Sequence, residues 1–451
     1  MRYCNFKQGA YSTRDAARHF IPHFSSILGA LFYFFIYLTA MLNIFFWLIL
    51  IIVLLSHFTG LFLDYLNNKM WSDEVPEKLK GIIDNEKYRR SQQYYRENKK
   101  FSNIASSFNL IVVLLMLTLA GFALLDTMSR SFTSNEVIIT LIFFGSIGVA
   151  KNIMGLPFSW YGIFKIEEKY GFNKTTTRIF ITDQLKGLFL SIVIGGPVLA
   201  FITWIFYVTG EMFWFYIWIV LILFALFMNM FYSELIVPLF NKQRPLEEGE
   251  LRDEIEMMAK KAQFKLTDIY TIDGSKRSTR ANAYFSGIGK KKRIVLYDTL
   301  SNDLTNQEIV AVLAHEIGHY KKRHTRTMLF AGIFQTGLML YIFSLLSDNI
   351  MLSRALGAEN TSFHISLLAF ILIYSPVSLL ISLVMNLISR KFEYEADEFA
   401  RNAYSGLLLA SALKKLSVKN LSNMMPHPLY VFFYYSHPPL IDRLKYLEQT
   451  H

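Results

Sequence analysis

The chain of 451 residues is 53% hydrophobic, 16% aromatic and only 18% charged, which is too apolar for a soluble enzyme of this length. Its net charge of +11 lies mostly between long apolar runs, and we interpret it as the basic loops of a membrane protein rather than a nucleic-acid-binding surface. The single cysteine, Cys4, excludes an internal disulfide and a zinc site built from several thiolates.

The first apolar block covers residues 26–63 and follows a polar, mildly basic stretch. As one helix, its roughly 38 residues would extend ~57 Å, whereas the hydrocarbon core of a bilayer is ~30 Å thick. The block is therefore either a tight pair of spans or one span with an apolar helical extension. Met41 is a second candidate for the start of the chain, and it would leave a single span from about Ile44 to Tyr65. We expect residues 1–40 to form an N-terminal extension.

Further apolar stretches predict transmembrane helices at about residues 104–125, 137–156, 185–209, 213–237, 328–346 and 365–388. With the first block counted once, we expect about seven spans in a mainly α-helical, polytopic membrane protein. Basic segments alternate with connections that are nearly free of Lys and Arg. These basic segments are 64–103, 157–186, 238–326 and 389–451.

This alternation predicts the orientation of the chain. Because basic loops remain in the cytosol, the N-terminus is expected outside, and the C-terminus and all candidate catalytic segments in the cytosol. The basic N-terminal tail, with Arg2, Lys7, Arg14 and Arg18, argues the other way and would fit an additional, eighth span.

The polar segment from about residue 238 has secondary structure of its own. An amphipathic helix is predicted over 250–263, and strands are predicted over 269–272, 282–286 and 293–297. Thr305 and Glu308 form a capping-box pattern, which predicts the start of another helix. We therefore expect a membrane domain over 41–237, and a domain over 238–451 that combines a small α+β unit with the last two spans.

The helix that begins near Thr305 carries the motif H-E-x-x-H at residues 315–319. This spacing places the imidazoles of His315 and His319 one turn apart on one face, where both can bind a single zinc ion. Glu316 lies about 100° further around the helix and is placed to take a proton from a water molecule. Burying these three residues beside a membrane span without a metal would be costly. We therefore predict one zinc ion per chain.

A third protein ligand must come from elsewhere in the chain. The metzincin pattern would require glycine at position 322 and histidine at position 325, but these positions are Lys322 and Thr325. His324 lies five residues beyond His319, and we expect it to turn away from the ligand face and to contact lipid headgroups as a cation.

The better candidate is Glu393, on a second helix that continues the last span. Glu393 and Asp397 share a face at a spacing of four residues, and Ala396 and Ala400 are small enough to allow tight helix contact. We predict Glu393 as the third ligand, and Asp397 as an acceptor from a histidine ring N–H that fixes the orientation of the ring. Glu395 is expected to point to the opposite side.

Several elements follow one another along the chain: H-E-x-x-H, two spans, E-x-x-x-D at 393–397, and Ser436-His437-Pro438-Pro439. This order resembles that of the type-I CAAX prenyl proteases, which are integral membrane zinc metalloendopeptidases. Similar segments occur at 75–76, 274–278, 282–284 and 295–300, so that the resemblance extends over about residues 44–447. It implies seven long helices that form a barrel around a large hydrophilic chamber, with the zinc site facing inward and the metalloprotease domain on the cytosolic side.

The resemblance also implies roles for individual residues. His315, His319 and Glu393 would bind zinc, and Glu316 would be the general base. The segment Asn282-Ala283-Tyr284 would lie on the edge strand that pairs with the substrate backbone.

His437 and Arg443 would stabilise the oxyanion, a role that suits a positioned imidazole and a guanidinium. For His437 the alternative is a polar cap of the final helix near Pro438. For Arg443 the alternative is an ion pair with Asp442 or Glu448.

The function implied is hydrolysis of the peptide bond after a prenylated cysteine, which releases the C-terminal tripeptide of a protein substrate. Two other functions remain open: a quality-control metalloprotease without prenyl specificity, and a channel or lipid carrier with structural zinc. Glu316 discriminates against the latter, since a structural site has no need of a carboxylate that is not a ligand. The expected location is the endoplasmic reticulum membrane of a eukaryote or the inner membrane of a bacterium. We expect a peptide or protein substrate and the lipid bilayer as partners and no nucleic acid, and we infer no oligomeric partner from the sequence.

Overall fold

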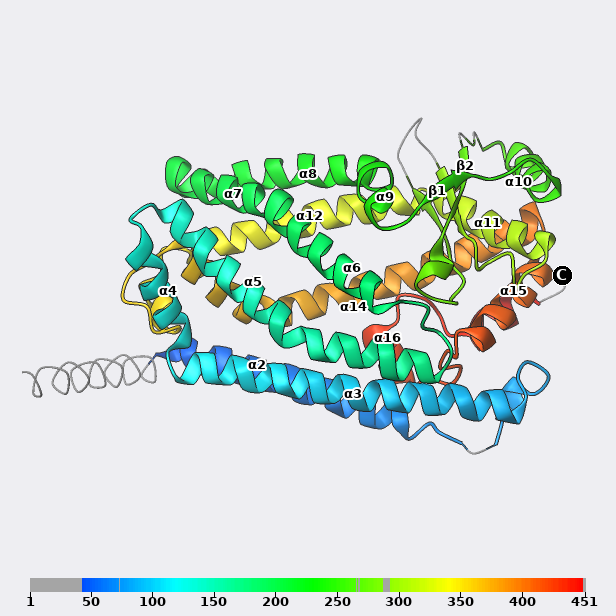
Figure 1. The fold of residues 1–451 in the computed structure, drawn as a ribbon, viewed down its shortest axis with the longest axis horizontal. Coiled ribbons are helices and arrows are strands. Elements are labelled where there is room, and N and C mark those ends of the chain that lie inside the picture. Colours follow the sequence, from blue (N-terminus) through cyan, green and yellow to red (C-terminus); the bar gives the residue numbers. More distant parts are fainter. Residues whose placement is uncertain (1–42, 73, 265, 267, 287–292, 449–451) are drawn as a thin grey trace, which may run out of the picture.

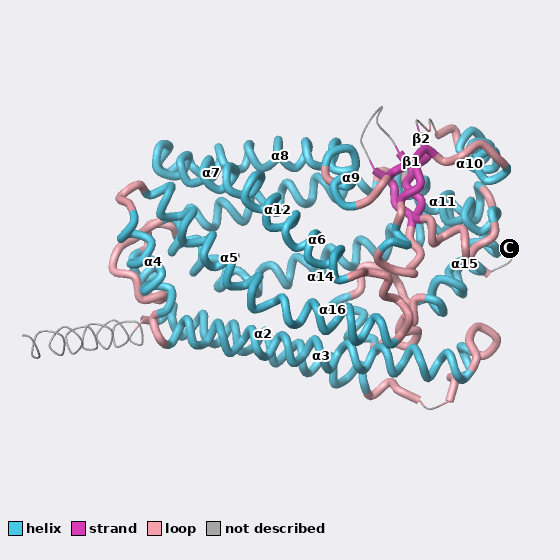
Figure 2. The backbone as a smooth tube through the Cα atoms, viewed as in Figure 1, coloured by secondary structure: helices cyan, strands magenta, loops and turns pink. Residues whose placement is uncertain are grey.

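The computed structural model describes residues 43–448, apart from 73, 265, 267 and 287–292. The N-terminal extension lies outside these residues, as does the part of the first apolar block that decides between one span and two. Long helices run side by side along the longest axis of the molecule (Figure 1). Figure 2 shows that the strands gather at one end of these helices.

Six helical stretches among the described residues are long and apolar enough to cross a membrane. They are Ile44–Asn68, Asn85–Thr118, Glu136–Glu167, Thr177–Phe240, His324–Leu346 and Phe363–Ala403. In each, at most 17% of the most apolar part is buried inside the protein, as expected of helices that lipid would cover. The prediction of a mainly α-helical, polytopic membrane protein is confirmed.

The six helical stretches do not correspond one to one to the seven expected spans. Thr177–Phe240 is 64 residues long and contains both of the spans expected over 185–209 and 213–237. These two spans meet at a short 3₁₀ turn, Gly210–Met212. The number seven and the enclosed chamber remain predictions.

The second membrane helix differs from its prediction at both ends. Residues 85–103, expected in a cytosolic loop, form one continuous helix with the span, α3 (Asn85–Thr118), because no glycine or proline interrupts them. The helix ends before residue 125, since Ala120 adopts a left-handed conformation with φ 51° and a separate helix, α4 (Gly121–Phe132), follows.

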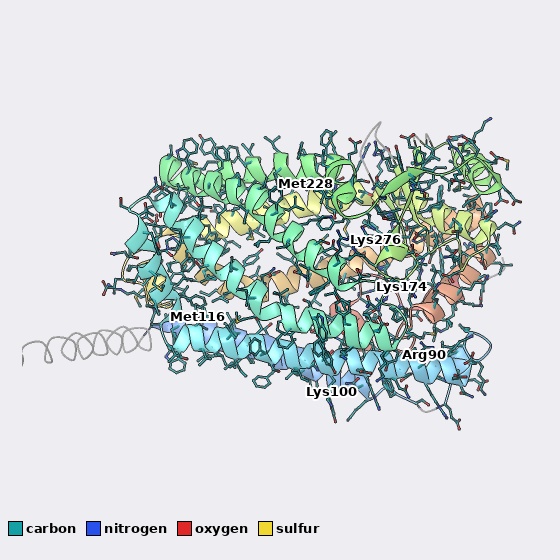
Figure 3. The ribbon with its side chains drawn as sticks, in the orientation of Figure 1. Arg90, Lys100, Met116, Lys174, Met228 and Lys276 are labelled. Atoms are coloured by element: carbon teal, nitrogen blue, oxygen red, sulfur yellow. The ribbon has the colours of Figure 1, made fainter. Side chains whose placement is uncertain are left out.

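The remaining helices of the membrane part are α2 (Ile44–Asn68), α5 (Glu136–Tyr161), α6 (Thr177–Leu190), α7 (Gly196–Thr209), α8 (Phe213–Leu235), α9 (Val237–Phe240), α12 (His324–Leu346), α13 (Ile350–Arg354) and α14 (Phe363–Ala403). Of the basic residues labelled in Figure 3, Arg90, Lys174 and Lys276 lie toward the strand end of the molecule and Lys100 lies nearer its middle, while Met116 lies toward the opposite end. This distribution is the one expected if the strand end faces the cytosol.

Four strands form one sheet in the order β1-β2-β4-β3. β2 (Asp268–Ile272) pairs in parallel with β4 (Arg293–Tyr297), while β1 (Gln243–Pro245) and β3 (Ala283–Ser286) add antiparallel at the edges. The last three strands along the chain fall where the sequence predicts them. The sequence does not predict β1, because its three residues are too few to show alternation.

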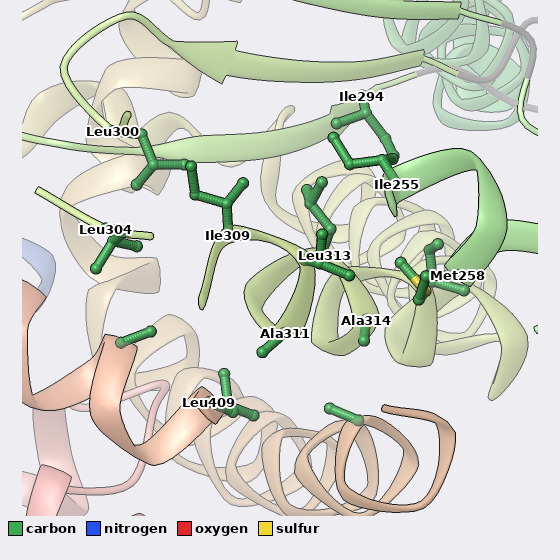
Figure 4. Packing of buried hydrophobic residues seen from close by; sticks show 14 of the residues in the cluster. Ile255, Met258, Ile294, Leu300, Leu304, Ile309, Ala311, Leu313, Ala314 and Leu409 are labelled. Carbon is green, nitrogen blue, oxygen red and sulfur yellow. The ribbon is translucent and has the colours of Figure 1, made fainter. Parts of the chain in front are cut away.

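α11 (Asn306–Lys321) lies at the centre of this end of the molecule. Leu313 packs with Ile255 of α10 (Glu250–Lys261) and with Ile294 of β4, while Ala314 and Leu409 of α15 (Gly406–Lys419) belong to the same core (Figure 4). All five side chains are almost completely buried. The core therefore fixes the helix that carries the H-E-x-x-H motif, and α16 (Pro428–Tyr434) and α17 (Leu440–Leu447) complete the fold.

α11 and α14 are in close contact at Gly318. A Cβ atom added there would lie 3.1 Å from both the Cα and the carbonyl oxygen of Ala396, closer than side-chain carbons normally approach. The contact therefore requires a glycine on α11, and it brings the last turns of α11 against the part of α14 that carries Glu393.

Gly318→Val is expected to destabilise the protein by about 1–3 kcal/mol, because the added methyl groups must displace the backbone of α14. The same variant should lose bound zinc, since the two helices carry the predicted ligands. Gly332→Val is the matched control, as a Cβ atom at Gly332 meets nothing within 4 Å. Thermal unfolding and the metal content of both purified variants measure the effect, and equal behaviour of the two would contradict the close helix contact.

Candidate active site

The helix with the H-E-x-x-H motif is anchored at its start. Thr305 Oγ1 accepts from Glu308 N at 3.3 Å and Glu308 Oε2 accepts from Thr305 N at 2.9 Å, which is the predicted capping box. Glu308 also accepts from Ser411 at 2.7 Å and from Lys415 at 2.8 Å, so that the cap ties α11 to α15. Burial raises the pKa of Glu308, but these hydrogen bonds outweigh it and lower the pKa below its usual value.

Three potential metal ligands converge from α11 and α14. The Nε2 atoms of His315 and His319 lie 3.1 Å apart. Glu393 Oε1 lies 3.3 Å from His319 Nε2, and Glu393 Oε2 lies 3.5 Å from His315 Nε2. The potential ligand atoms all lie within 4.8 Å of one another, and Glu393 is only 4% exposed.

This group of donors suits a zinc ion. Glu393 Oε2 is buried and accepts no hydrogen bond, and the two facing Nε2 atoms can share at most one. A cation between the three side chains would satisfy all of them. Two imidazole nitrogens and one carboxylate oxygen are a ligand set found in catalytic zinc sites, which keep the fourth position open.

Asp397 lies behind His315, on the side away from the other ligands. Its Oδ1 is 2.8 Å from His315 Nδ1, an arrangement that directs the other ring nitrogen toward Glu393. Arg443 donates from Nε and Nη2 to the two oxygens of Asp397, at 2.8 and 2.6 Å, and its Nη1 lies 3.3 Å from Glu393 Oε2. The buried charge of Asp397 is therefore paired.

The alternative of an ion pair between Arg443 and Asp442 or Glu448 is wrong. The helix α17 turns Arg443 inward, so that only 8% of the residue is exposed and Asp397 and Glu393 are its partners. Glu448 lies just beyond the end of the helix and pairs with Lys414 at 2.6 Å.

The pKa of His315 reflects the acidic groups around it. Burial lowers this pKa, but the nearby carboxylates of Asp397 and Glu393 outweigh burial and raise it to about 9. In the metal-free chain, a proton on His315 would compensate for the charge of Glu393. A metal ion would replace this proton, because a ligand imidazole must be neutral.

His315, His319 and Glu393 are called the ligand group below. His437 lies at the open side of this group. Its Nε2 is 3.4 Å from Glu393 Oε1, its Nδ1 is 3.0 Å from Ser436 Oγ, and 63% of the side chain is exposed. The alternative of His437 as a helix cap is wrong, because the cap position of α17 is Pro439 and no side chain bonds to the helix end there.

A cavity of about 270 Å³ opens at the ligand group. Its lining includes Asn282, Ala283, Glu316, His437 and Arg443. The structure thus brings together nearly all of the residues predicted to form the site. Tyr284 is the exception, since it faces a neighbouring cavity instead.

This second cavity has a volume of about 680 Å³ and lies between α8 and α12, with a mainly apolar wall. Ala225 and Met228 of α8 and Leu329 of α12 line it (Met228 is labelled in Figure 3). Glu316 and His319 line both cavities, so the larger one also reaches the ligand group.

The prediction that His324 faces lipid headgroups is wrong. His324 is 3% exposed; its Nδ1 lies 3.0 Å from His319 Nδ1, and its Nε2 lies 2.9 Å from Glu395 Oε2. α11 ends at Lys321, and Arg323 then adopts a left-handed conformation with φ 63°, so that His324 begins α12 and returns toward the site. Glu395 was predicted to point to the side opposite Glu393. Because His324 returns toward the site, Glu395 contacts this neighbour of His319.

Comparison with known proteins identifies the family of this chain. A family model for the CAAX prenyl protease N-terminal region, with five membrane helices, matches residues 64–242, and a model for peptidase family M48 matches residues 245–451. The CAAX prenyl protease 1 homolog of Oryza sativa subsp. japonica is 38% identical over 387 residues, which cover 83% of this chain and 90% of that protein. CAAX prenyl protease 1 of Saccharomyces cerevisiae is 36% identical over 406 residues, with coverages of 84% and 90%.

A crystal structure of S. mikatae Ste24p has a similar fold, with a TM-score of 0.85 and 34% sequence identity, and the match covers 90% of this chain and 99% of that one. The resemblance expected from the sequence is thus confirmed, and the chain belongs to peptidase family M48, among the CAAX prenyl proteases.

Proposed function

We propose that this chain is a zinc-dependent endopeptidase of the membrane, which removes the C-terminal tripeptide that follows a prenylated cysteine. The observation that carries the proposal is the convergence of His315, His319 and Glu393 beside Glu316, a carboxylate that is not one of the three. The names of the relatives supply the substrate class and favour prenyl processing over membrane quality control. A channel or lipid carrier with structural zinc would have no use for Glu316.

The reaction is peptide hydrolysis with Glu316 as general base. When bound, zinc would acidify a water molecule and polarise the scissile carbonyl group. Glu316 takes the proton from the attacking water and returns it to the leaving amine, which its place on the wall of both cavities allows.

His437 is our candidate for stabilising the oxyanion. It is exposed at the open side of the ligand group, 3.4 Å from Glu393 Oε1, where it can donate to charge that develops on the substrate. Arg443 lines the same cavity, but its guanidinium is already bound to Asp397 and lies beside Glu393. We therefore assign to Arg443 the holding of these two carboxylates in addition to any contact with substrate.

The edge strand β3 is our candidate for binding the substrate backbone. Among the described strands it pairs only with β4, and Asn282 and Ala283 at its start line the smaller cavity. An extended peptide can add to such an edge with its scissile bond near Glu316. Tyr284, on the wall of the larger cavity, would contact a side chain or the lipid instead.

The larger cavity between α8 and α12 is our candidate for the prenyl chain. Its wall is mainly apolar, it lies between two helices that are apolar enough to cross a membrane, and it reaches Glu316 and His319. A prenyl chain bound there would stay out of water while the peptide enters the site.

The orientation and the domain division extend this proposal. Arg90, Lys174 and Lys276 lie toward the strand end of the molecule, which supports a cytosolic position for that end. We propose a membrane domain over 41–237 and a metalloprotease domain over 238–451 that includes α12 and α14. The endoplasmic reticulum of a eukaryote, or the inner membrane of a bacterium, is the location that fits the substrate and the orientation.

Glu316→Gln is expected to reduce the release of tripeptide from a farnesylated peptide by at least about 10²–10⁴-fold, because the general base is lost. Bound zinc should be retained, because Glu316 is not a ligand. Mass spectrometry of the products and metal analysis of the same preparation measure both quantities. Glu398→Gln, the same change on α14 at a different cavity, is the control. Full hydrolysis by Glu316→Gln, or a parent chain that cleaves no farnesylated peptide, would contradict the proposed function.

Ala225→Trp should fill the cavity between α8 and α12. We expect KM for a farnesylated peptide to rise at least about tenfold, with little change for an unprenylated peptide of the same sequence, because only the lipid is excluded. Leu223→Trp is the matched control, since Leu223 lies on the same helix and is 61% exposed on its outer side. Equal effects on both peptides would show that the cavity does not bind the lipid.

A further inference from the structure

The two histidines of the ligand group are held from behind in different ways. His315 Nδ1 contacts the carboxylate of Asp397 directly, at 2.8 Å. His319 Nδ1 contacts a third histidine instead, since His324 Nδ1 lies 3.0 Å away. The sequence motif does not include His324, and the proposed reaction does not use it.

The surroundings fix the ring of His324. It stacks on Phe392 with a centroid distance of 4.0 Å and an interplanar angle of 6°. Its Nε2 lies 2.9 Å from Glu395 Oε2, and the residue is 3% exposed. Phe392 and Glu395 both belong to α14, the helix of Glu393, so one helix carries a ligand and also holds the group behind another ligand.

His319, His324 and Glu395 form a row of hydrogen-bonded side chains. Glu395, at the end of the row, determines which atom of each pair is the donor. A carboxylate only accepts, so His324 Nε2 must be the donor to Glu395. In the neutral imidazole of His324, Nδ1 is then the acceptor, and His319 Nδ1 must carry the proton that it donates. His319 Nε2 is left as a free lone pair, which points toward His315 and Glu393. The row thus sets the tautomer that a metal ligand requires.

The negative charge at the end of this row is less compensated than that of Asp397. Arg443 donates twice to Asp397, whereas the only cation near Glu395 is Lys391 at 3.8 Å, among the ion pairs of the described residues. Glu395 therefore remains free to polarise the row toward His319 and to make Nε2 a stronger donor to a metal.

We propose that His324 and Glu395 form a relay that positions His319 and fixes its tautomer for zinc. The inference rests on the proposed metal site of His315, His319 and Glu393. His324 is a positioning residue, since it acts through His319 and does not touch the metal.

The test is the zinc affinity of the purified full-length chain in detergent, measured by competition with a chromophoric chelator. His324→Ala is expected to weaken zinc binding by about 10–100-fold, the usual effect of removing a partner behind a metal ligand. His324→Gln should stay within about threefold of the parent, because its carboxamide can accept from His319 and donate to Glu395. Glu395→Ala should weaken binding by about tenfold. Glu398→Ala, on the same helix, should leave it unchanged.

The visible spectrum of the cobalt-substituted chain provides a second readout. We expect His324→Ala to shift the absorption bands of bound cobalt and His324→Gln to restore them, because the orientation of His319 sets the ligand field. A purely structural role for His324 would lower thermal stability and leave both the affinity and the spectrum of the folded fraction unchanged.

Unchanged zinc affinity in His324→Ala would overturn the relay, as would equal losses in His324→Ala and His324→Gln. If His324→Ala does not fold, Glu395→Ala decides, because Glu395 is one-third exposed and its loss leaves the stack on Phe392 intact. Parent affinity in that variant also overturns the relay. A parent chain that binds no zinc would instead refute the proposed metal site.

Discussion

The arrangement of the site depends on the contact between α11 and α14. Gly318 lets the two helices approach at Ala396, and this approach brings Glu393 to the face of α11 that presents His315 and His319. α14 is a single helix from Phe363 to Ala403, so the segment that crosses the membrane and the segment that carries Glu393 are one element. The position of the third ligand is therefore set by the same packing that assembles the membrane helices.

Charge is the second constraint on the site. Asp397 and Arg443 are both buried and pair with each other, which leaves Glu393 as the buried carboxylate with an oxygen that accepts no hydrogen bond. Such an arrangement favours a positive charge between the three side chains, as a proton on His315 or as a metal ion. The side chains behind the ligands orient different histidines. Asp397 orients His315, and we infer that His324 and Glu395 orient His319.

The sequence predicted the features that depend on local pattern. Long apolar runs predicted the membrane helices, the Thr305–Glu308 spacing predicted the start of α11, and the shared face of Glu393 and Asp397 follows from helical periodicity. It did not predict that α3 continues through its charged half, because charge alone does not end a helix. Nor did it predict the place of His324, which depends on a left-handed backbone at Arg323, a residue type that gives no signal for it. The sequence also left the partners of Arg443 open, because they lie on another helix and are distant in sequence.

X-ray absorption spectroscopy at the zinc edge of the purified, zinc-loaded chain can identify the side chains that bind the metal. Imidazole rings give a characteristic multiple-scattering pattern, so the measurement counts histidine ligands independently of activity. We expect two imidazole nitrogens at about 2.0–2.1 Å and a carboxylate oxygen at about 2.0–2.2 Å. A fit that requires a third imidazole would contradict this expectation, because His324 or His437 would then hold the position assigned to Glu393.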